Sequence, residues 1–457
     1  MKPGGRQVCS DAGMNSGPRR QILNVGAFDV SDVRPGTETA FADGILTINI
    51  EELEEHLSAD PELAAVSVEI IRPGEPVRGI NAIDAVEPRI KVDPPGADFS
   101  GLLTAPQLVG TGTTHALKGV AVVETALPVP GEPRYWREAI FDMAGSGAGY
   151  SPLSELINVV VSCEPTTALL ESEDRPTNVF EGTPEAVEYN KAVRLAGLKA
   201  ARYLAETTLG KKPDRVDTYD LAPSPVNGLP AVVYLYQLAI PFLHGEIAPG
   251  AGAIGGTAHL PTPIHPNELL DGALVCGWNA IACMRELTYT VQNHAIVEDL
   301  YARHGEDIDF RGVVLFTNGD TRAAKARLAN HAANLAIMMG AEGALINYAG
   351  GGHPAVDAMM ICRNLERRGV TTTMLSMEMA ANPGESGFVH FVPEADAIVS
   401  TGNYEETALF EPVERVIGGD AMIRIEADPS GAFEAPLAIV MASTHQFGGT
   451  HIRGEEY

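Results

Sequence analysis

The chain has 457 residues, which is long for one domain and sufficient for two or three. Its 60 acidic and 32 basic side chains give a formal charge of −28, which repels nucleic-acid phosphates and anionic lipid head groups. We therefore expect no nucleic acid and no membrane among its partners, and a small-molecule substrate bound at a local site.

Cysteine usage and the N-terminal sequence bear on the cellular compartment. Five scattered cysteines, an odd number, do not form a disulfide framework, and this predicts a reducing, cytoplasmic location. Residues 1–21 contain basic side chains with no apolar run behind them, so we expect a flexible tail instead of a secretory signal. No stretch approaches the roughly 18 apolar residues that cross a bilayer.

The first part of the chain, residues 22–165, is predicted to be a strand-rich N-terminal domain. A short helix is expected at 50–60, and a fully apolar run at 157–163 predicts a strand covered on both faces. Further strands are predicted from three β-branched runs: 44–50, 66–73 and 115–127.

A central α/β region is expected over residues 166–278. A polar stretch at 164–184 predicts an exposed loop, and apolar residues near a period of about 3.6 predict a helix over 184–210. A buried strand is predicted at 230–240. The loop that follows, 241–272, is rich in glycine and proline, and loops of this length usually carry function or move.

Residues 279–457 are predicted to form a C-terminal α/β domain. Helices are expected at 321–340 and 353–369, between strands that are predicted at 312–317, 343–349, 371–377 and 395–401. Alternation of strand and helix at this spacing favours a parallel sheet. The fold class expected for the whole chain is α/β, with a strand-rich N-terminal region and a C-terminal parallel sheet.

A glycine-rich loop, "NYAGGGHPAVD", joins a predicted strand to a predicted helix. Backbone N–H groups and a helix N-terminus can face an anion in such a loop, so Gly351, Gly352 and His353 are candidates for substrate binding. The alternative is a glycine turn that lets helix and strand pack closely.

Two other polar residues lie at the ends of apolar runs. Asp142 and Glu378 follow predicted strands, and ligands bind at strand ends of open parallel sheets, so Asp142 is a further substrate-binding candidate. Both carboxylates would serve equally to cap a following turn. His445 and His451, six positions apart beside a Gly-Gly pair, are further candidate metal ligands, with a surface turn as the alternative.

Histidines and cysteines gather around the central loop. His244, His259 and His265 precede Cys276 and Cys283, and imidazole and thiolate are usual ligands of zinc and iron. A divalent metal held by the three histidines is therefore one interpretation. The spacing matches no familiar closed zinc motif, and solvated loop histidines are the other interpretation.

Several segments, in order, resemble a known family. They include "GTGTTHALKGVAVV", "FDMAGSGAGYSPLSELINVVVSCEP" and "LLDGALVCGWNAIACMRELTY". From about residue 22 to the C-terminus, the chain is similar to the α/β-subunit precursor of component B of glycine, sarcosine and betaine reductases. The D-proline reductase precursor is a more distant relative.

The resemblance implies an activity in amino-acid metabolism. In that family, the precursor cleaves itself at an Asn-Cys step, and the cysteine becomes a pyruvoyl group. Its carbonyl forms a Schiff base with the substrate amine, which weakens the Cα–N bond. A selenocysteine-bearing γ subunit takes part in the reductive cleavage. The resemblance thus implies a hetero-oligomer with a γ-like partner.

This sequence departs from the family at the residues that form the pyruvoyl group. Trp278 and Asn279 stand where the family has Asn and Cys. The acyl shift that makes a pyruvoyl needs a thiol or hydroxyl, and Asn279 has neither, so we expect no pyruvoyl there. Cleavage displaced to Val275–Cys276 is an alternative.

Two hypotheses follow. In the first, the chain is an enzyme subunit that cleaves a C–N or related bond of a small nitrogen-containing substrate without a pyruvoyl group. Cys276, Asn279 and Cys283 are then the catalytic candidates, with a rebuilt thiol or metal site using zinc or iron. In the second, the chain is a non-catalytic scaffold that binds substrate for a γ-like partner.

Overall fold

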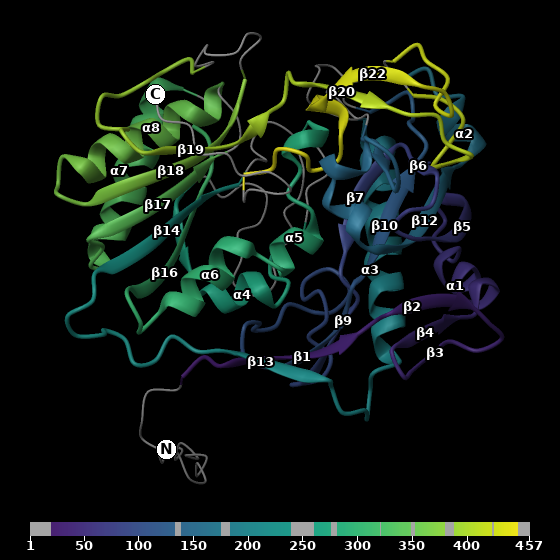
Figure 1. Cartoon of the computed structure of the whole chain (residues 1–457), viewed down its shortest axis with the longest axis horizontal. Coiled ribbons are helices and arrows are strands. Elements are labelled where there is room, and N and C mark those ends of the chain that lie inside the picture. Colours follow the sequence, from purple (N-terminus) through teal and green to yellow (C-terminus); the bar gives the residue numbers. More distant parts are fainter. Residues whose placement is uncertain are drawn as a thin grey trace, which may run out of the picture.

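The computed structural model describes residues 20–132, 139–174, 183–238, 260–275, 281–319, 321–348, 352–379, 388–422 and 425–446. Figure 1 shows two lobes joined by a layer of short helices. The predicted fold class is confirmed: the lobe that contains most of the N-terminal strands is strand-rich, and the other lobe is built on a largely parallel sheet.

Two four-stranded sheets form the main part of the strand-rich lobe. The first has the order β5 (Leu63–Ile71), β12 (Ile157–Pro165), β10 (Val120–Ala126) and β7 (Ala82–Val86). The second has the order β13 (Arg215–Tyr219), β1 (Leu23–Asp29), β9 (Gly112–Lys118) and β8 (Arg89–Asp93).

The long helix α3 (Pro184–Glu206) packs on the first sheet and buries an alanine-rich face there. Thr183 caps its start through its side-chain oxygen, and Pro184 occupies the first turn, as helix N-termini favour. The predicted helix at 184–210 is thus confirmed, although it ends at Glu206. Gly210 lies beyond it with φ of +73°, a conformation that glycine adopts readily.

Smaller elements complete this lobe. They are β2 (Asp32–Pro35), β3 (Ala40–Ala42), β4 (Ile45–Ile48), α1 (Ile50–Leu57), α2 (Thr167–Leu170), β6 (Val77–Gly79), β11 (Phe141–Asp142), β21 (Arg415–Ile417), β20 (Thr407–Phe410) and β22 (Phe433–Pro436). The last three come from the C-terminal part of the sequence, so the chain returns to this lobe after completing the other one.

The second lobe is a six-stranded sheet. Its order is β15 (Thr262–Ile264), β16 (Asp309–Phe316), β14 (Ala231–Gln237), β17 (Gly343–Tyr348), β18 (Thr371–Glu378) and β19 (Ile398–Asn403). All neighbours are parallel except β15, which runs antiparallel at the edge. The strand predicted at 230–240 is therefore the centre of this sheet.

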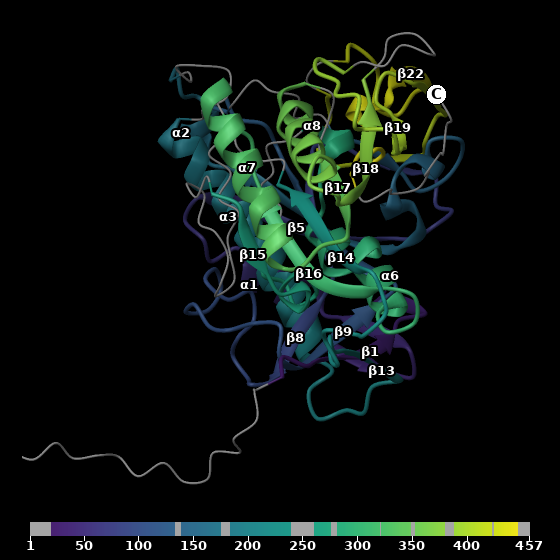
Figure 2. The same ribbon diagram turned by 90° about the vertical axis from the view of Figure 1, so that its left-hand side faces the viewer.

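Helices cover both faces of the sheet. Figure 2 shows α7 (Arg322–Met338) and α8 (His353–Glu366) across one face. The other face carries α4 (Pro266–Leu270), α5 (Thr288–Gln292) and α6 (Ala295–Arg303). Alternate residues of β14 serve the two faces: Val233 and Leu235 pack toward α7 and α8, and Tyr234 and Tyr236 pack toward the short helices.

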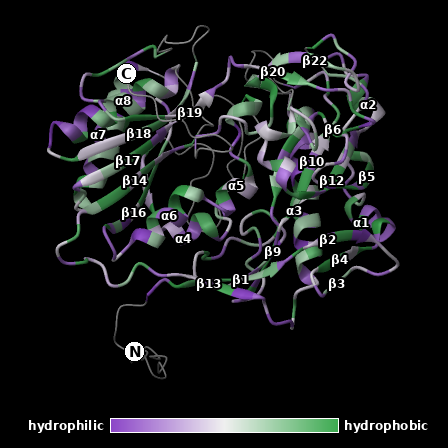
Figure 3. Ribbon diagram, viewed as in Figure 1, coloured by the Kyte–Doolittle hydropathy of each residue, from purple (hydrophilic) through white to green (hydrophobic). Residues whose placement is uncertain are grey.

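Hydropathy follows this layering. Figure 3 shows hydrophobic residues along the inner strands and hydrophilic ones mainly on outer turns. Within the described ranges, none of the helices has the length and hydropathy that crossing a bilayer requires. The loop expected at 241–272 contains β15 and α4 in its described part. The proposed domain boundaries stay a prediction, although β14 and β15 pair with the C-terminal strands and β13 pairs with β1.

Candidate functional site

In the second lobe, the order in which successive strands are added to the sheet reverses at β14. The chain forms β14 first, adds β16 on one side of it, and then adds β17, β18 and β19 on the other. In open α/β sheets, ligands bind at the carboxyl ends of the strands where this reversal occurs. A ligand site is therefore expected at the carboxyl ends of β14 and β17.

Side-chain amides gather at these strand ends. The backbone N–H of Gln237 donates to Oδ1 of Asn347 at 3.2 Å, and its Nε2 donates to Oδ1 of Asn318 at 2.7 Å. Nε2 of Gln446, far along the chain, donates to the carbonyl oxygen of Gln237 at 2.7 Å. All four side chains are buried and uncharged, so they make the strand ends polar without adding a charge.

A buried carboxyl group lies on the opposite face of β14. The hydroxyl of Tyr236 donates to Oε2 of Glu286 at 2.6 Å, and Glu286 is only 8% exposed. Burial raises the pKa of this carboxyl to about 8, and the Tyr236 hydrogen bond lowers it only in part. The other oxygen, Oε1, is buried and has no hydrogen-bond partner among the described residues.

Two histidines accompany the tyrosines. His294 stands edge-on to the rings of Tyr234 and Tyr236, with ring centroids 5.4 Å away in each case. Burial lowers the pKa of His294 to about 3, with His445 nearby as a further cause, and it lowers the pKa of His445 to about 4. Both rings are therefore neutral at pH 7. The prediction of a surface turn at His445 is wrong, since this residue is 4% exposed.

The segment 281–288 connects the two lobes. Arg285 donates from Nη1 to the carbonyl oxygen of Ala82 in β7, at 2.5 Å, and Glu286 turns toward β14. Asp84 of β7 accepts the backbone N–H of Thr288 at 2.8 Å. Successive side chains thus fix this segment to both sheets. Glu286 was missed in the sequence, because no local motif marks it.

Cys283 lies in the same segment. It is fully buried among Ile281, Met377 and Ala438, and burial raises the pKa of its thiol to about 12. Its carbonyl oxygen accepts the N–H of Thr444 at 3.0 Å. This environment keeps the sulfur protonated and gives it the character of a small core residue.

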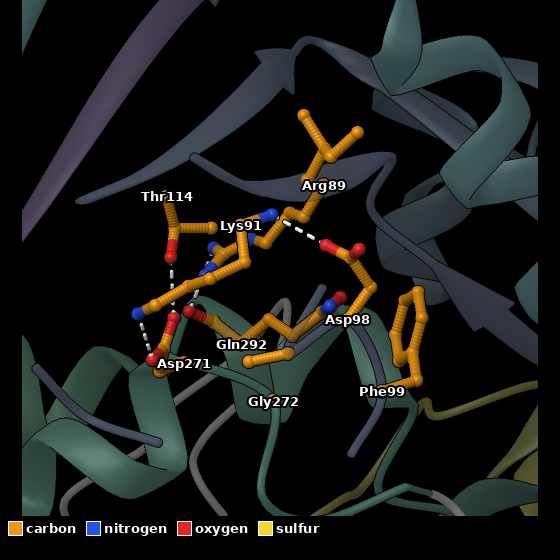
Figure 4. A pocket seen from close by; sticks show the side chains of 10 residues that line it. Arg89, Lys91, Asp98, Phe99, Thr114, Asp271, Gly272 and Gln292 are labelled. Carbon is orange, nitrogen blue, oxygen red and sulfur yellow. Dashed lines mark hydrogen bonds and ion pairs between the residues drawn. The ribbon is translucent and has the colours of Figure 1, made fainter. Parts of the chain in front are cut away.

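Asp271, five residues before Cys276, is also fixed by buried hydrogen bonds. Asp271 accepts an ion-paired hydrogen bond from Nζ of Lys91, one from Oγ1 of Thr114 at 2.5 Å, and one from the N–H of Gly110 at 2.7 Å. Figure 4 shows these side chains around a small pocket, which Asp98, Phe99 and Gln292 also line. Residues 273–275 continue from it as buried chain.

Part of the glycine-rich loop lies at the carboxyl end of β14. Gly352 precedes the first turn of α8, and the carbonyl of Pro354 accepts from Nε2 of Gln237 at 3.2 Å. The carbonyl of His353 accepts from Nζ of Lys325 at 3.1 Å. A Cβ added at Gly352 would meet no atom within 4 Å, so close packing does not require glycine there. Gly351 lies outside the described residues.

Asp142 lies in the other lobe. It forms a buried, two-point ion pair with Arg78, with distances of 2.6 and 2.8 Å. Burial raises the pKa of Asp142, although Arg78 opposes this effect. The guanidinium of Arg78 also stacks 4.6 Å from the centre of the Phe433 ring. The structure does not bring Asp142 near the strand ends of β14 and β17.

Of the three predicted metal-binding histidines, the described residues include His265. It caps α4, where its Nδ1 accepts the N–H of Asn267 at 3.2 Å, and burial lowers its pKa to about 4. His244, His259, His451, Cys276 and Asn279 lie outside the described residues. Among the residues that are described, no group of three or more His, Cys, Asp or Glu side chains is arranged to hold a metal ion.

The fold and the site define an α/β protein with a buried polar centre between two lobes. A family model for glycine/sarcosine/betaine reductase component B subunits matches residues 22–456. The chain belongs to this family, as its resemblance predicts.

Individual relatives agree with this assignment. The chain is 34% identical over 453 residues to the glycine reductase complex component B subunits alpha and beta of Acetoanaerobium sticklandii, covering 95% of this chain and 100% of that protein. It is 33% identical over 436 residues to the sarcosine reductase complex component B subunit alpha of Peptoclostridium acidaminophilum, covering 92% and 96%. For the betaine reductase complex component B subunit alpha of the same organism, the identity is 33% over 409 residues, covering 87% of each chain. No solved structure matches the chain significantly.

Proposed function

We propose that this chain is a subunit of a component B-like enzyme complex that cleaves a C–N or related bond in a small nitrogen-containing substrate. One observation carries the proposal. The described chain on either side of residues 276–280, the stretch of sequence that contains Trp278 and Asn279, is anchored: Asp271 bonds to Thr114 and Gly110 before it, and Arg285 bonds to Ala82 after it. Such rigid flanks suit a segment that must present reacting atoms in one geometry.

The pyruvoyl group of the family does not fit the residues present. Its formation needs a thiol or hydroxyl on the residue at the scissile bond, and the residue at that position here is Asn279. We therefore derive no step through a pyruvoyl group. Cys276 is the nearest thiol before it in the chain, and Cys283, held as a buried thiol, suits a packing role better than a nucleophilic one.

A γ-like partner and a zinc or iron ion remain parts of the proposal. The relatives are named as subunits of reductase complexes, which supports assembly with other proteins. For the metal, His265 could contribute only Nε2, because Nδ1 already accepts a hydrogen bond.

A second candidate function is a scaffold that binds substrate for its partner. The neutral side chains around β14 favour it, because a site rich in amides and neutral histidines suits recognition as well as catalysis.

Intact-mass spectrometry, combined with metal analysis of the same sample, tests the proposal. We expect one species near 48.4 kDa that does not react with a carbonyl reagent such as phenylhydrazine. Two fragments that divide near Cys276, with a reactive carbonyl, would contradict it and restore the pyruvoyl chemistry. Amine release by the chain reconstituted with its partner separates the enzyme from the scaffold: loss of activity in Cys276→Ser supports the first, and unchanged activity supports the second.

A further inference from the structure

The carboxyl group of Glu286 has a hydrogen atom with no acceptor in the described part of the protein. Tyr236 donates to Oε2, so Oε2 acts as the acceptor, and the proton of the acid form belongs on Oε1. Oε1 is buried and lacks a hydrogen-bond partner. A buried donor left unpaired is unfavourable, so this group calls for an acceptor that the described residues do not supply, such as an atom of a ligand.

Among the described residues, no cationic side chain forms a hydrogen bond or ion pair with this carboxyl. Arg285, its neighbour in the chain, points to the carbonyl of Ala82. Within the described ranges, no ion pair includes Glu286. The titratable groups of this cluster are Tyr234 and Tyr236 of β14, His294 between α5 and α6, and His445 of the C-terminal segment. Tyrosines and buried histidines are neutral at pH 7, so these four groups would offer a bound anion hydrogen-bond donors without a positive charge.

The names of the relatives indicate which group of the ligand accepts the hydrogen bond from Glu286. This inference rests on the proposed function. The relatives are named for glycine, sarcosine and betaine reductases. The nitrogen of betaine carries neither a hydrogen nor a lone pair, so it cannot accept a hydrogen bond. The carboxylate is the acceptor that the three molecules share.

We propose that Glu286, in its acid form, binds the carboxylate of the substrate through a hydrogen bond from Oε1. A neutral acid that donates to a carboxylate makes a short, charge-assisted hydrogen bond. The ligand class is therefore a small carboxylate. Ionised Glu286 would repel the carboxylate of the ligand. Protonation of Glu286 therefore strengthens ligand binding, and a bound ligand strengthens the binding of the proton.

Titration calorimetry with betaine from pH 6 to pH 10 tests the proposal, because betaine itself does not titrate in that range. We expect a constant Kd at the acid end and a Kd that rises about tenfold per pH unit above a midpoint near 8. A flat profile across the range would overturn the proposal.

Variants sharpen the test. In Glu286→Gln, the amide oxygen still accepts from Tyr236 and the amide nitrogen still donates, so we expect binding to persist without the midpoint near pH 8. Tyr236→Phe removes a hydrogen bond that lowers the pKa of Glu286, so the midpoint of the binding profile should move to higher pH. Glu298→Gln is the matched control, because Glu298 accepts from Tyr219 at 3.2 Å elsewhere in the fold, and its profile should equal that of the natural chain. A Glu286→Gln variant that keeps the pH profile of the natural chain would overturn the proposal.

Acetate, which has no nitrogen, separates this inference from the proposed function. If acetate and betaine bind with the expected pH profile but the assembled complex releases no amine, the proposed function fails and the carboxylate site stands. If neither compound binds at any pH, the carboxylate site is overturned, whatever the complex does.

Discussion

Gly197 of α3 lies directly above Glu124 of β10. A Cβ placed on Gly197 would stand 1.9 Å from Oε1 of Glu124. Both oxygens of Glu124 are buried without a hydrogen-bond partner, and burial raises its pKa well above 4.5, with Asp84 as a further cause. The helix therefore approaches the sheet on top of a carboxyl group that stays protonated.

Replacing Gly197 with alanine should destabilise the protein, although alanine is the better helix former. The added methyl group must displace a buried side chain, and overpacking of this kind costs about 1–3 kcal/mol. Urea unfolding of the two proteins measures the difference. The double variant Glu124→Ala/Gly197→Ala removes the obstructing atoms, so the cost of the glycine substitution should fall in that background. An equal cost in both backgrounds would contradict the contact.

Glu124 should also make stability depend on pH. The folded protein keeps its proton, while the unfolded chain releases it above pH 4.5, so the unfolded state binds fewer protons in this range. Stability must then fall as the pH rises from 4.5, by up to about 1.4 kcal/mol per pH unit for this one group. Glu124→Gln should lack that part of the slope in unfolding curves at pH 5, 6 and 7. Glu164→Gln, at an exposed position of the neighbouring strand, should keep it.

Asp271 should be a major support of the chain that leads to residue 276. Asp271→Asn breaks a buried ion pair with Lys91, and leaving one buried charge without its partner costs about 3–5 kcal/mol. Amide hydrogen exchange over residues 272–275 should accelerate in the variant. Asp307→Asn removes an exposed ion pair with Arg303, and we expect little change from it in either measurement. Similar losses for the two variants would argue against a special role for Asp271.

Cys283 should resist alkylation in the native protein. Because burial raises the pKa of its thiol from 9.0 to about 12, the thiolate fraction at pH 8 falls about a thousandfold. Peptide mapping after iodoacetamide treatment should find it modified only when the chain is first unfolded in urea. Cys362 of α8 serves as an internal comparison, because burial raises the pKa of its thiol to about 11. Rapid native labelling of Cys283 would instead favour its catalytic role.

The elements of the parallel sheet could be predicted because their signals are local. The helix expected at 321–340 spans Arg322–Met338, and Gly340 follows it with φ of +82°. The helix expected at 353–369 begins at His353 as predicted and ends at Glu366. Periodicity and a terminal glycine suffice for such elements, since neither depends on distant residues.

The site could be predicted only in outline. The strand-end rule holds for parallel strands, but Asp142 is the last residue of β11, which pairs antiparallel with β6, and its carboxylate is ion-paired with Arg78. Glu286 acquires its raised pKa from burial in the tertiary structure, and its hydrogen-bond partner, Tyr236, lies fifty positions earlier in the chain. His445 lies beside a Gly-Gly pair typical of turns, yet the segment containing it enters the interior. Contacts across such separations leave no periodic pattern in the sequence.

The segment that ends at Gln446 has a consequence for biosynthesis. Its residues bond to Cys283 and to the end of β14, and they leave the ribosome after every strand of the parallel sheet. The bonds that Thr444 and Gln446 make to the polar centre can therefore form only after all six strands of that sheet have been synthesised.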